Sequence, residues 1–220
     1  MRCRQAAAIV LASLFVFEGI AQAGSDISAS ASAIVMPGGP RSGTNGKVFL
    51  NAQGRKTTAD GKYASFGVIE FQAPKDAKVA KVKGLTITLV ESIPSFARRG
   101  PIKFYLTTDT KTSLEPAEPP AKPALKFDTS SPDGLGDQLK PRFLLGSSQF
   151  VKDETGHADT YLLTIDGDAE AYLRGQCNSG GEIRLIVVPD SDDVAATYFG
   201  AGERNAANRP KLTMDSEPAS

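Results

Sequence analysis

Residues 182–189 have the sequence EIRLIVVP, an apolar run with the length of a buried β-strand. An acidic turn, DSDD at residues 190–193, separates it from a second run, VAATYFGAGE at residues 194–203. A third segment, PKLTMD at residues 210–215, opens on a proline, which is tolerated at the first residue of a strand. Three such runs divided by turns predict that the chain ends in three strands of a β-sandwich.

Strand-like patterns of apolar residues also occur before residue 182. In residues 83–91, KGLTITLVE, apolar side chains alternate with threonines, so that one strand face is apolar and the other suits solvent. In residues 101–107, PIKFYLT, every second side chain is apolar and faces the core. Lys103 and Tyr105 therefore face outward. Shorter strands are predicted at residues 47–51, 63–71, 124–127, 149–151 and 160–165.

A single short helix interrupts the strands. Residues 169–174 are helix formers, Asp166 suits the capping position, and Gly175 suits the end of a helix. We expect about two turns that close one end of the sandwich. Many short strands without crossover helices between them predict an all-β fold, an antiparallel, jelly-roll-like β-sandwich with one short helix.

Residues 1–23 have the layout of a secretory signal peptide. Arg2 and Arg4 precede an apolar run over residues 6–20, and AQA at residues 21–23 is a small-x-small cleavage site. An N-terminal membrane anchor is the alternative, but the run is shorter than the roughly 20 residues that cross a bilayer. We therefore predict a secreted protein, extracellular or periplasmic, with no membrane span in its mature chain.

The remaining chain is expected to divide into parts of unequal order. Residues 24–46 are rich in small, polar and turn-forming residues and predict a flexible leader and loop. Residues 47–215 are expected to form a single β-sandwich domain, followed by a tail at residues 216–220. Repeated prolines mark residues 109–141 as a long surface loop, because proline donates no ladder hydrogen bond. Such loops are functional, disordered, or insertions of no consequence.

Charge and cysteine content exclude several classes of protein. The chain has 25 basic and 25 acidic residues, which argues against non-specific nucleic-acid binding, since that requires clustered lysine and arginine. Cys177 is the one cysteine beyond the predicted signal peptide, so an intramolecular disulfide is excluded. Its neighbours resemble a loop, which leaves burial and intermolecular pairing both open.

The order of several segments matches a known type of domain. These segments are GVIEF (67–71), VKGLTITL (82–89), TID before the predicted helix (164–166), and AATYFG with RPKLT near the end (195–200 and 209–213). Together they resemble the DNRLRE-type, carbohydrate-binding-module-like β-sandwich domains of bacterial secreted proteins. The resemblance implies a non-catalytic extracellular module of the kind found in cell-surface, polysaccharide-degrading or surface-assembly proteins.

Catalytic motifs are sparse. His157 is the single histidine and lies in a polar turn, so neither a Ser/His/Asp nor a Cys/His arrangement has local support. A zinc site is not expected, because no spacing brings enough ligands together. A glycosidase needs two facing carboxylates, for which Asp166 with Asp168, or Glu70 with Glu91, are candidates. Surface carboxylates are common, so an enzyme of polysaccharide breakdown is the third of our three interpretations.

Calcium is the cation that the acidic residues suggest, because carboxylates at strand ends suit a hard ion. The candidate ligands are Asp166, Asp168, Asp190, Asp192 and Asp193. The alternative needs no metal: one aspartate caps the helix and the others form an acidic turn. The hypothesis is a structural calcium ion that stabilises the fold, and no other cofactor is expected.

Sugar binding needs flat aromatic side chains, and the chain has five tyrosines and no tryptophan. Tyr105, with Lys103 beside it, is the predicted ligand-binding pair; the alternative is that the tyrosine only covers the sheet. The leading interpretation is a secreted, non-catalytic module that binds a polysaccharide or another cell-surface component. The second is a structural or adhesive surface protein that binds protein partners or assembles with itself.

Overall fold

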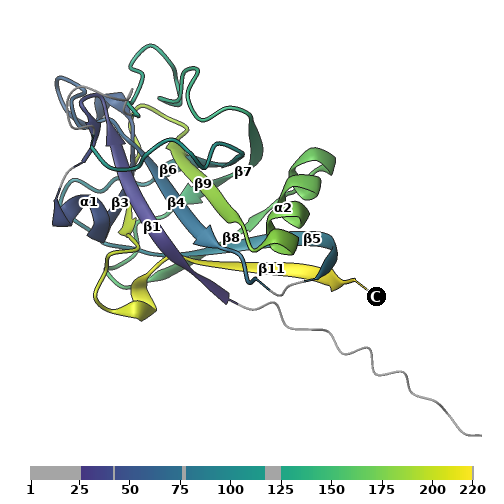
Figure 1. Ribbon diagram of the computed structural model, residues 1–220. Helices are drawn as coiled ribbons and strands as arrows, with labels where there is room; N and C mark the ends of the chain where they lie inside the picture. Colours follow the sequence, from purple (N-terminus) through teal and green to yellow (C-terminus); the bar gives the residue numbers. More distant parts are fainter. Residues whose placement is uncertain (1–25, 42, 76–77, 117–124, 220) are drawn as a thin grey trace, which may run out of the picture.

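The structure is a computed structural model that describes residues 26–41, 43–75, 78–116 and 125–219 (Figure 1). The predicted signal peptide at residues 1–23 lies outside the described residues. Among the helices that the structure describes, none is long and apolar enough to cross a membrane.

The described chain is mostly antiparallel β-structure. Its strands are β1 (Asp26–Met36), β2 (Gly39–Pro40), β3 (Phe49–Gln53), β4 (Phe66–Gln72), β5 (Val79–Val90), β6 (Gly100–Thr107), β7 (Arg142–Phe150), β8 (Ala158–Leu163), β9 (Glu182–Pro189), β10 (Ala195–Phe199) and β11 (Lys211–Pro218). Its helices are α1 (Thr44–Val48) and α2 (Gly167–Ser179), with single 3-10 turns at Arg55–Thr57 and Ala206–Asn208.

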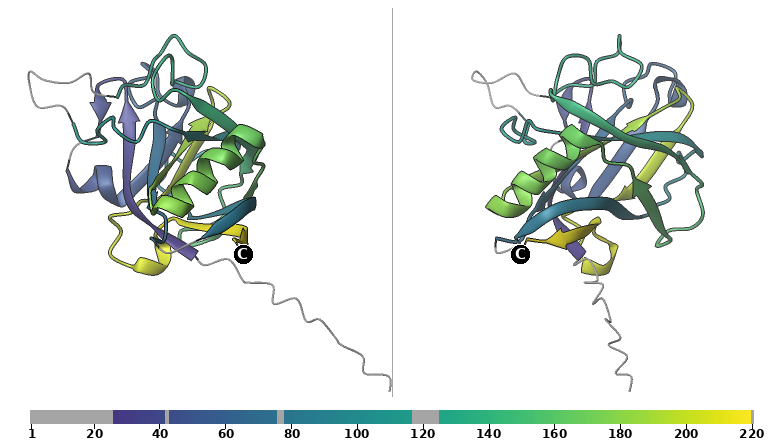
Figure 2. Two further views of the ribbon diagram at one scale, coloured as in Figure 1. Left: turned by 45° about the vertical axis from the view of Figure 1, so that its right-hand side comes forward. Right: turned by 90° about the vertical axis from the view of Figure 1, so that its right-hand side faces the viewer.

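One large sheet curls almost into a closed barrel (Figures 1 and 2). Within the described residues it has nine strands, in the order β7-β6-β9-β4-β1-β11-β5-β8, with β2 paired to β1. The chain leaving β8 returns to β7, where the Thr164 amide donates to the Leu145 carbonyl at 2.7 Å. β3 and β10 form a separate antiparallel pair. The predicted all-β antiparallel sandwich is confirmed.

The core fills the space inside the curled sheet. Alternation on β5 is confirmed, since Leu85, Ile87 and Leu89 are at most 2% exposed. Phe104 on β6 is fully buried and packs against the Tyr161 ring of β8, with 4.9 Å between ring centroids. Each such side chain contributes roughly 1.5–3 kcal/mol of hydrophobic stabilisation. The inward faces of opposite strands therefore hold the sandwich closed.

A second apolar cluster covers the outer face of β4 and β9. Val68, Ile186 and Val188 are fully buried there, although they point away from the main core. The loop of residues 125–139 supplies the cover, with buried side chains at Leu125, Phe127, Leu135 and Leu139. We call this the outer cluster. It explains why the run at residues 182–189 is apolar on both strand faces.

The loop that forms this cover contains no strand in its described part. The strand predicted at residues 124–127 is therefore wrong for residues 125–127, and residue 124 lies outside the described chain. The Phe127 amide donates to the Met36 carbonyl at 3.0 Å, but no ladder continues from this contact. Side-chain burial, rather than strand pairing, holds this segment.

The flexible leader predicted at residues 24–46 is wrong for the part that the structure describes. β1 pairs with β11 through residues 26–28 and with β4 through residues 29–35. α1 follows at Thr44–Val48, so it replaces the end of the predicted loop and the first two residues of the strand predicted at residues 47–51, which begins at Phe49 as β3. Alanine and serine bury little apolar area, which hid β1 from a hydrophobicity argument. Its backbone groups nevertheless find ladder partners on both sides, and that satisfies them in the folded state.

α2 is longer than predicted and packs across β5 (Figure 2). The predicted cap is confirmed, since Asp166 Oδ1 accepts from the Ala169 amide at 3.3 Å. The predicted end at Gly175 is wrong, because the helix continues to Gly180, which adopts the left-handed conformation with φ 62°. Cys177 lies in this helix, fully buried, and not in a loop. Burial of Leu173 and Cys177 offsets the roughly 1 kcal/mol that a helical glycine costs.

Candidate functional site

The predicted ligand pair, Lys103 and Tyr105, lies on one face of β6 at an open polar pocket of about 370 Å³. Lys103 Nζ lies 2.5 Å from Asp190 Oδ1, which raises the pKa of the lysine. The Arg142 guanidinium lies over the Tyr105 ring, 5.9 Å from its centroid. Tyr105 also packs against the outer cluster. The Lys103 ammonium group and the Tyr105 ring thus have partners within the protein, and the role of the pair in ligand binding stays a prediction.

The five aspartates predicted to bind calcium have separate roles in the structure. Asp166 caps α2, and Asp168 is exposed in its first turn. Asp192 holds Arg55 through two hydrogen bonds, of 2.8 Å and 3.2 Å, which lowers the pKa of this carboxyl. Asp190 pairs with Lys103, as described above. Within the described residues, the group of three side chains that lie close enough to share a cation is Asp153, His157 and Asp159. None of the five predicted calcium ligands, including Asp193, belongs to this group.

A more apolar hollow lies between the β3–β10 pair and the loop after β5. Phe49 and Phe199 line it with stacked rings, 6.1 Å apart between centroids, and Phe96 lines it with a ring that is 44% exposed. This hollow measures about 380 Å³ and adjoins a second one of about 330 Å³, which includes Tyr63 at 49% exposure. We call the two together the aromatic groove. The residues that line both hollows are Arg41, Asn51 and Phe96.

Polar groups without protein partners also line the aromatic groove. Ser65 Oγ and Thr58 Oγ1 are buried and make no hydrogen bond within the described part of the chain. A buried hydroxyl without a partner costs about 1–3 kcal/mol. A ligand or water molecule that bonds to these hydroxyls would therefore be favoured. Arg41 is exposed and adds a positive charge between the two hollows.

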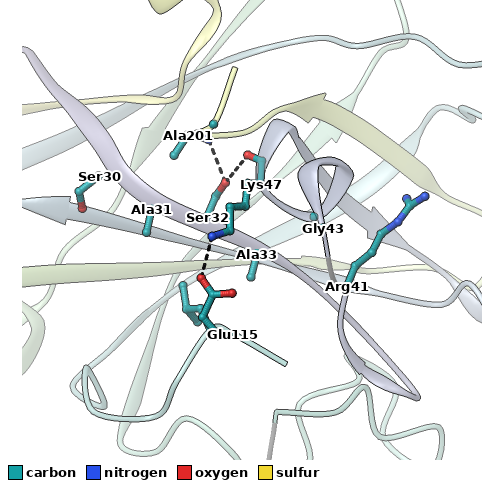
Figure 3. A pocket seen from close by; sticks show the side chains of 12 residues that line it. Ser30, Ala31, Ser32, Ala33, Arg41, Gly43, Lys47, Glu115 and Ala201 are labelled. Carbon is teal, nitrogen blue, oxygen red and sulfur yellow. Dashed lines mark hydrogen bonds and ion pairs between the residues drawn. The ribbon is translucent and has the colours of Figure 1, made fainter. Parts of the chain in front are cut away.

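A smaller pocket of about 190 Å³ also borders Arg41 (Figure 3). Several of its polar groups have partners within the protein: Ser32 Oγ donates to the Lys47 carbonyl at 3.3 Å and accepts from the Ala201 amide at 2.8 Å. Lys47 Nζ pairs with Glu115 at 2.9 Å. Figure 3 shows Arg41 extending away from this ion pair. The pocket holds α1 against β1, and its contacts are structural.

Functional groups also gather where β5 ends, around Glu91. Glu91 is fully buried and binds the loop before β8 at three points. Its amide donates to the His157 carbonyl at 2.8 Å, and its own carbonyl accepts from the Gly156 amide at 2.9 Å. Glu91 Oε2 accepts from the Asp153 amide at 2.8 Å. The second carboxylate oxygen, Oε1, has no hydrogen-bond partner within the described residues.

Other ionisable groups surround Glu91. Burial, together with the neighbouring carboxylate of Asp159, raises the pKa of Glu91 to about 7. Tyr161 donates its hydroxyl to Asp159 Oδ2 at 2.9 Å and lies 2.7 Å from the Tyr198 hydroxyl. Burial raises the pKa of both tyrosines, so both remain neutral hydrogen-bond donors. His157 Nε2 lies 3.2 Å from Asp153 and 3.7 Å from Asp159.

Glu70, suggested from the sequence as a catalytic partner of Glu91, has a different environment. It forms an ion pair with Arg184 on β9, whose side chain is 3% exposed. Arg184 also donates to the carbonyls of Asp109, Thr110 and Thr112 at 2.8–3.1 Å. Arg184, paired with Glu70, therefore anchors the start of the long loop, while the carboxylates beside Glu91 are those of Asp153 and Asp159.

Sequence reasoning named Glu91 and His157 separately but missed that they lie close together, and it missed the aromatic groove. The groove had one weak signal, a phenylalanine at position 96 in the polar segment SIPSFARR. The second group had a signal in its spacing, because aspartates lie four residues before and two residues after His157. No signal in the sequence indicates that Glu91 lies beside these aspartates, because it is 62 positions away from Asp153 in the chain.

Comparison with known proteins adds no assignment. No protein-family model matches the chain, and no curated protein matches it either.

Proposed function

We propose that this protein is a secreted, non-catalytic module that binds a polysaccharide or another cell-surface component in the aromatic groove. The observation that carries the proposal is the combination, in one groove, of exposed Phe96 and Tyr63 rings with unpartnered buried hydroxyls. Aromatic side chains offer flat apolar surfaces, and a few convergent polar groups orient a bound ligand. A sugar has both an apolar ring face and hydroxyl groups, so it matches both features.

Arg41 narrows the proposed ligand class. Arg41 is exposed and lines both hollows, and a guanidinium group can form paired hydrogen bonds to a carboxylate or sulfate group. We therefore favour an acidic polymer over a neutral one. The resemblance to DNRLRE-type domains supports an extracellular binding role, and the signal-peptide layout of residues 1–23 supports secretion.

Affinity electrophoresis of the purified protein on acidic and neutral polysaccharides tests the proposal. We expect retardation by an acidic polymer. Phe96→Ala should weaken the affinity about tenfold, equivalent to about 1.4 kcal/mol, because a stacking surface is lost. Arg41→Gln should remove the preference for acidic over neutral polymers.

Matched controls separate the groove from the general surface. Leu144→Ala removes a 52% exposed side chain on β7, and Arg99→Gln removes an exposed guanidinium that does not line the groove. Both should leave retardation unchanged. Weakening by Tyr105→Ala but not by Phe96→Ala would move the site to the polar pocket.

Two further outcomes distinguish the alternatives. An absence of retardation on every polymer would reject the glycan proposal and favour a structural or adhesive protein that binds protein partners or itself. Cleavage of a polymer would identify an enzyme instead, and Glu91→Gln would then be the first variant to assay.

A further inference from the structure

The loop between β7 and β8 brings three metal-ligating side chains together. One ligand atom from each of Asp153, His157 and Asp159 lies within 4.8 Å of the other two. Two of these separations are shorter, 3.2 Å and 3.7 Å from His157 Nε2. Ligands at roughly 2.0–2.2 Å from one ion lie about 3–4 Å apart, so only small rotations are needed. Asp153 and His157 are exposed and free to make them.

Glu91 provides an independent observation that points to a ligand. It comes from β5, is fully buried, and is directed at this cluster, because Oε2 accepts from the Asp153 amide at 2.8 Å. Its other oxygen, Oε1, accepts no hydrogen bond from a donor of the described residues, and the carboxyl group lies beside that of Asp159. A buried carboxylate oxygen without a hydrogen bond is costly, and a cation beside it would remove that cost.

The charge of the cluster is also unbalanced. Glu91, Asp153 and Asp159 are three carboxyl groups, and His157 is the one basic side chain within 4.0 Å of any of them in the described chain. Besides His157, the hydrogen-bond partner of the Asp159 carboxyl is the neutral Tyr161 hydroxyl, which in turn bonds to the Tyr198 hydroxyl. A divalent ion would supply the missing positive charge.

We propose that Asp153, His157 and Asp159, with Glu91 behind them, bind one divalent transition-metal ion, Zn²⁺ or Mn²⁺. An imidazole nitrogen together with carboxylate oxygens suits these ions, whereas Ca²⁺ prefers six to eight oxygen ligands. The site is independent of the proposed glycan function. It is also different from the calcium site that the sequence suggested, with which it shares no residue.

The position of the site gives the ion a structural role. Thr155 lies in the same loop, accepts from the Ile93 amide at 3.1 Å, and lines the aromatic groove. An ion held by Asp153 and His157 would tie both ends of this turn to β5 and β8. The wall of the groove would then be fixed by the metal.

Isothermal titration of the metal-free purified protein with Zn²⁺, Mn²⁺ and Ca²⁺ tests the proposal. We expect one equivalent of Zn²⁺ or Mn²⁺ to bind and to raise the melting temperature, with Ca²⁺ binding more weakly. Asp153→Asn and His157→Gln should each weaken binding at least about tenfold, since even residues that only support metal ligands have effects of this size. Both residues are exposed, so both variants are expected to fold.

Asp193→Asn, which changes an exposed aspartate outside the cluster, is the matched control and should leave the affinity unchanged. Absence of stoichiometric binding, or binding that survives both exposed-ligand variants, would overturn the proposal. In that case the contacts of His157 with the two aspartates are structural. Tighter binding of Ca²⁺ than of either transition metal would also overturn it. Because the titration contains no polysaccharide, its result is separate from that of the glycan test.

Discussion

At the scale of single residues, Glu91 stands out as a carboxyl group in a fully buried environment. Its side chain is fully buried, two other carboxyl groups lie near it, and it holds the loop of residues 153–157. Burial disfavours its charged form, and the negative charge of Asp159 adds to this effect. A residue that helps hold the fold is therefore also one that titrates near neutral pH.

Glu91→Gln is expected to change how the stability of the metal-free protein depends on pH. The pKa of Glu91 is raised from 4.5 to about 7 in the folded protein. The folded state therefore binds the Glu91 proton more tightly than the unfolded state does. This contribution to the free energy of unfolding is fully present below about pH 4.5 and is lost as the pH rises to about 7. Between about pH 4 and pH 8, the wild type should lose roughly 3 kcal/mol more stability than the variant, at 1.36 kcal/mol per pKa unit.

Urea unfolding in the presence of a chelator, followed by circular dichroism, measures this difference. Asp153, His157 and Asp159 face Glu91, and Tyr161 and Tyr198 lie behind Asp159, but all five are retained in both proteins. The two proteins therefore differ only in the carboxyl group at position 91. A stability difference that stays constant over the whole pH range would contradict the assignment of the raised pKa to Glu91.

At the scale of elements, α2 shows how tertiary contacts set the ends of a helix. It buries Ala169, Leu173 and Cys177 on one face, and its last turn docks on β5 through Asn178. Asn178 accepts from the Val79 amide at 2.7 Å and donates to the Val79 carbonyl at 3.0 Å. These contacts extend the helix past Gly175, where local propensity alone predicted its end.

Gly180→Ala and Gly175→Ala are expected to have opposite effects on stability. At Gly180 the backbone is left-handed, and an added Cβ would lie 2.9 Å from Lys75 Cα. We expect this variant to lose about 1–2 kcal/mol or more. At Gly175 nothing lies within 4 Å of an added Cβ, so alanine should stabilise by up to about 1 kcal/mol.

Thermal and urea unfolding of the two variants measure both effects. The pair serves as its own control, because each variant adds the same methyl group to the same element. Equal effects of the two substitutions would show that Gly180 is not the left-handed cap that ends α2.

At the scale of the whole molecule, the sheet is covered on both sides. The main core fills the inside of the curled sheet, and the loop of residues 125–139 covers part of the outside. The Phe66 and Phe127 rings meet in the outer cluster with 6.3 Å between their centroids. The proline-rich segment is therefore, in its described part, a structural layer.

Phe127→Ala is expected to destabilise the whole fold and not merely release the loop. Phe127 is 3% exposed, and removing a buried phenylalanine side chain costs about 3–5 kcal/mol. Urea unfolding should remain a single transition at a lower midpoint, and limited proteolysis should cut within residues 125–141 more readily. Leu162→Ala, which removes an 85% exposed side chain on β8, should change stability by less than about 0.5 kcal/mol. Proteolysis of the loop without loss of global stability would show that the outer cluster is dispensable.

Agreement between sequence and structure follows the burial of side chains. β5, β6 and β9 were predicted because their side chains differ strongly between faces or are continuously apolar, and such patterns survive into the fold. β1 was missed because its alanines and serines carry little hydrophobic contrast. The two-sided burial of β9 was visible as an apolar run, but the loop that covers its outer face was not.

For the functional residues, the sequence predicts single side chains but not which of them lie together. The sequence identified Lys103, Tyr105 and the aspartates as individual polar or aromatic side chains, and the structure then gave Lys103, Asp190 and Asp192 partners within the protein. The aromatic groove and the group around Glu91 each draw residues from distant segments, so no local spacing predicts them.

The sequence alone therefore determined the all-β class, the main strands and the cap of α2, because strand alternation and capping depend on residues close together in the chain. Tertiary structure alone decided where α2 ends, what covers β9, and which carboxylates lie beside Glu91. These features depend on the free energy of burying groups that meet only when the sheet curls, and that free energy is not encoded in any single segment.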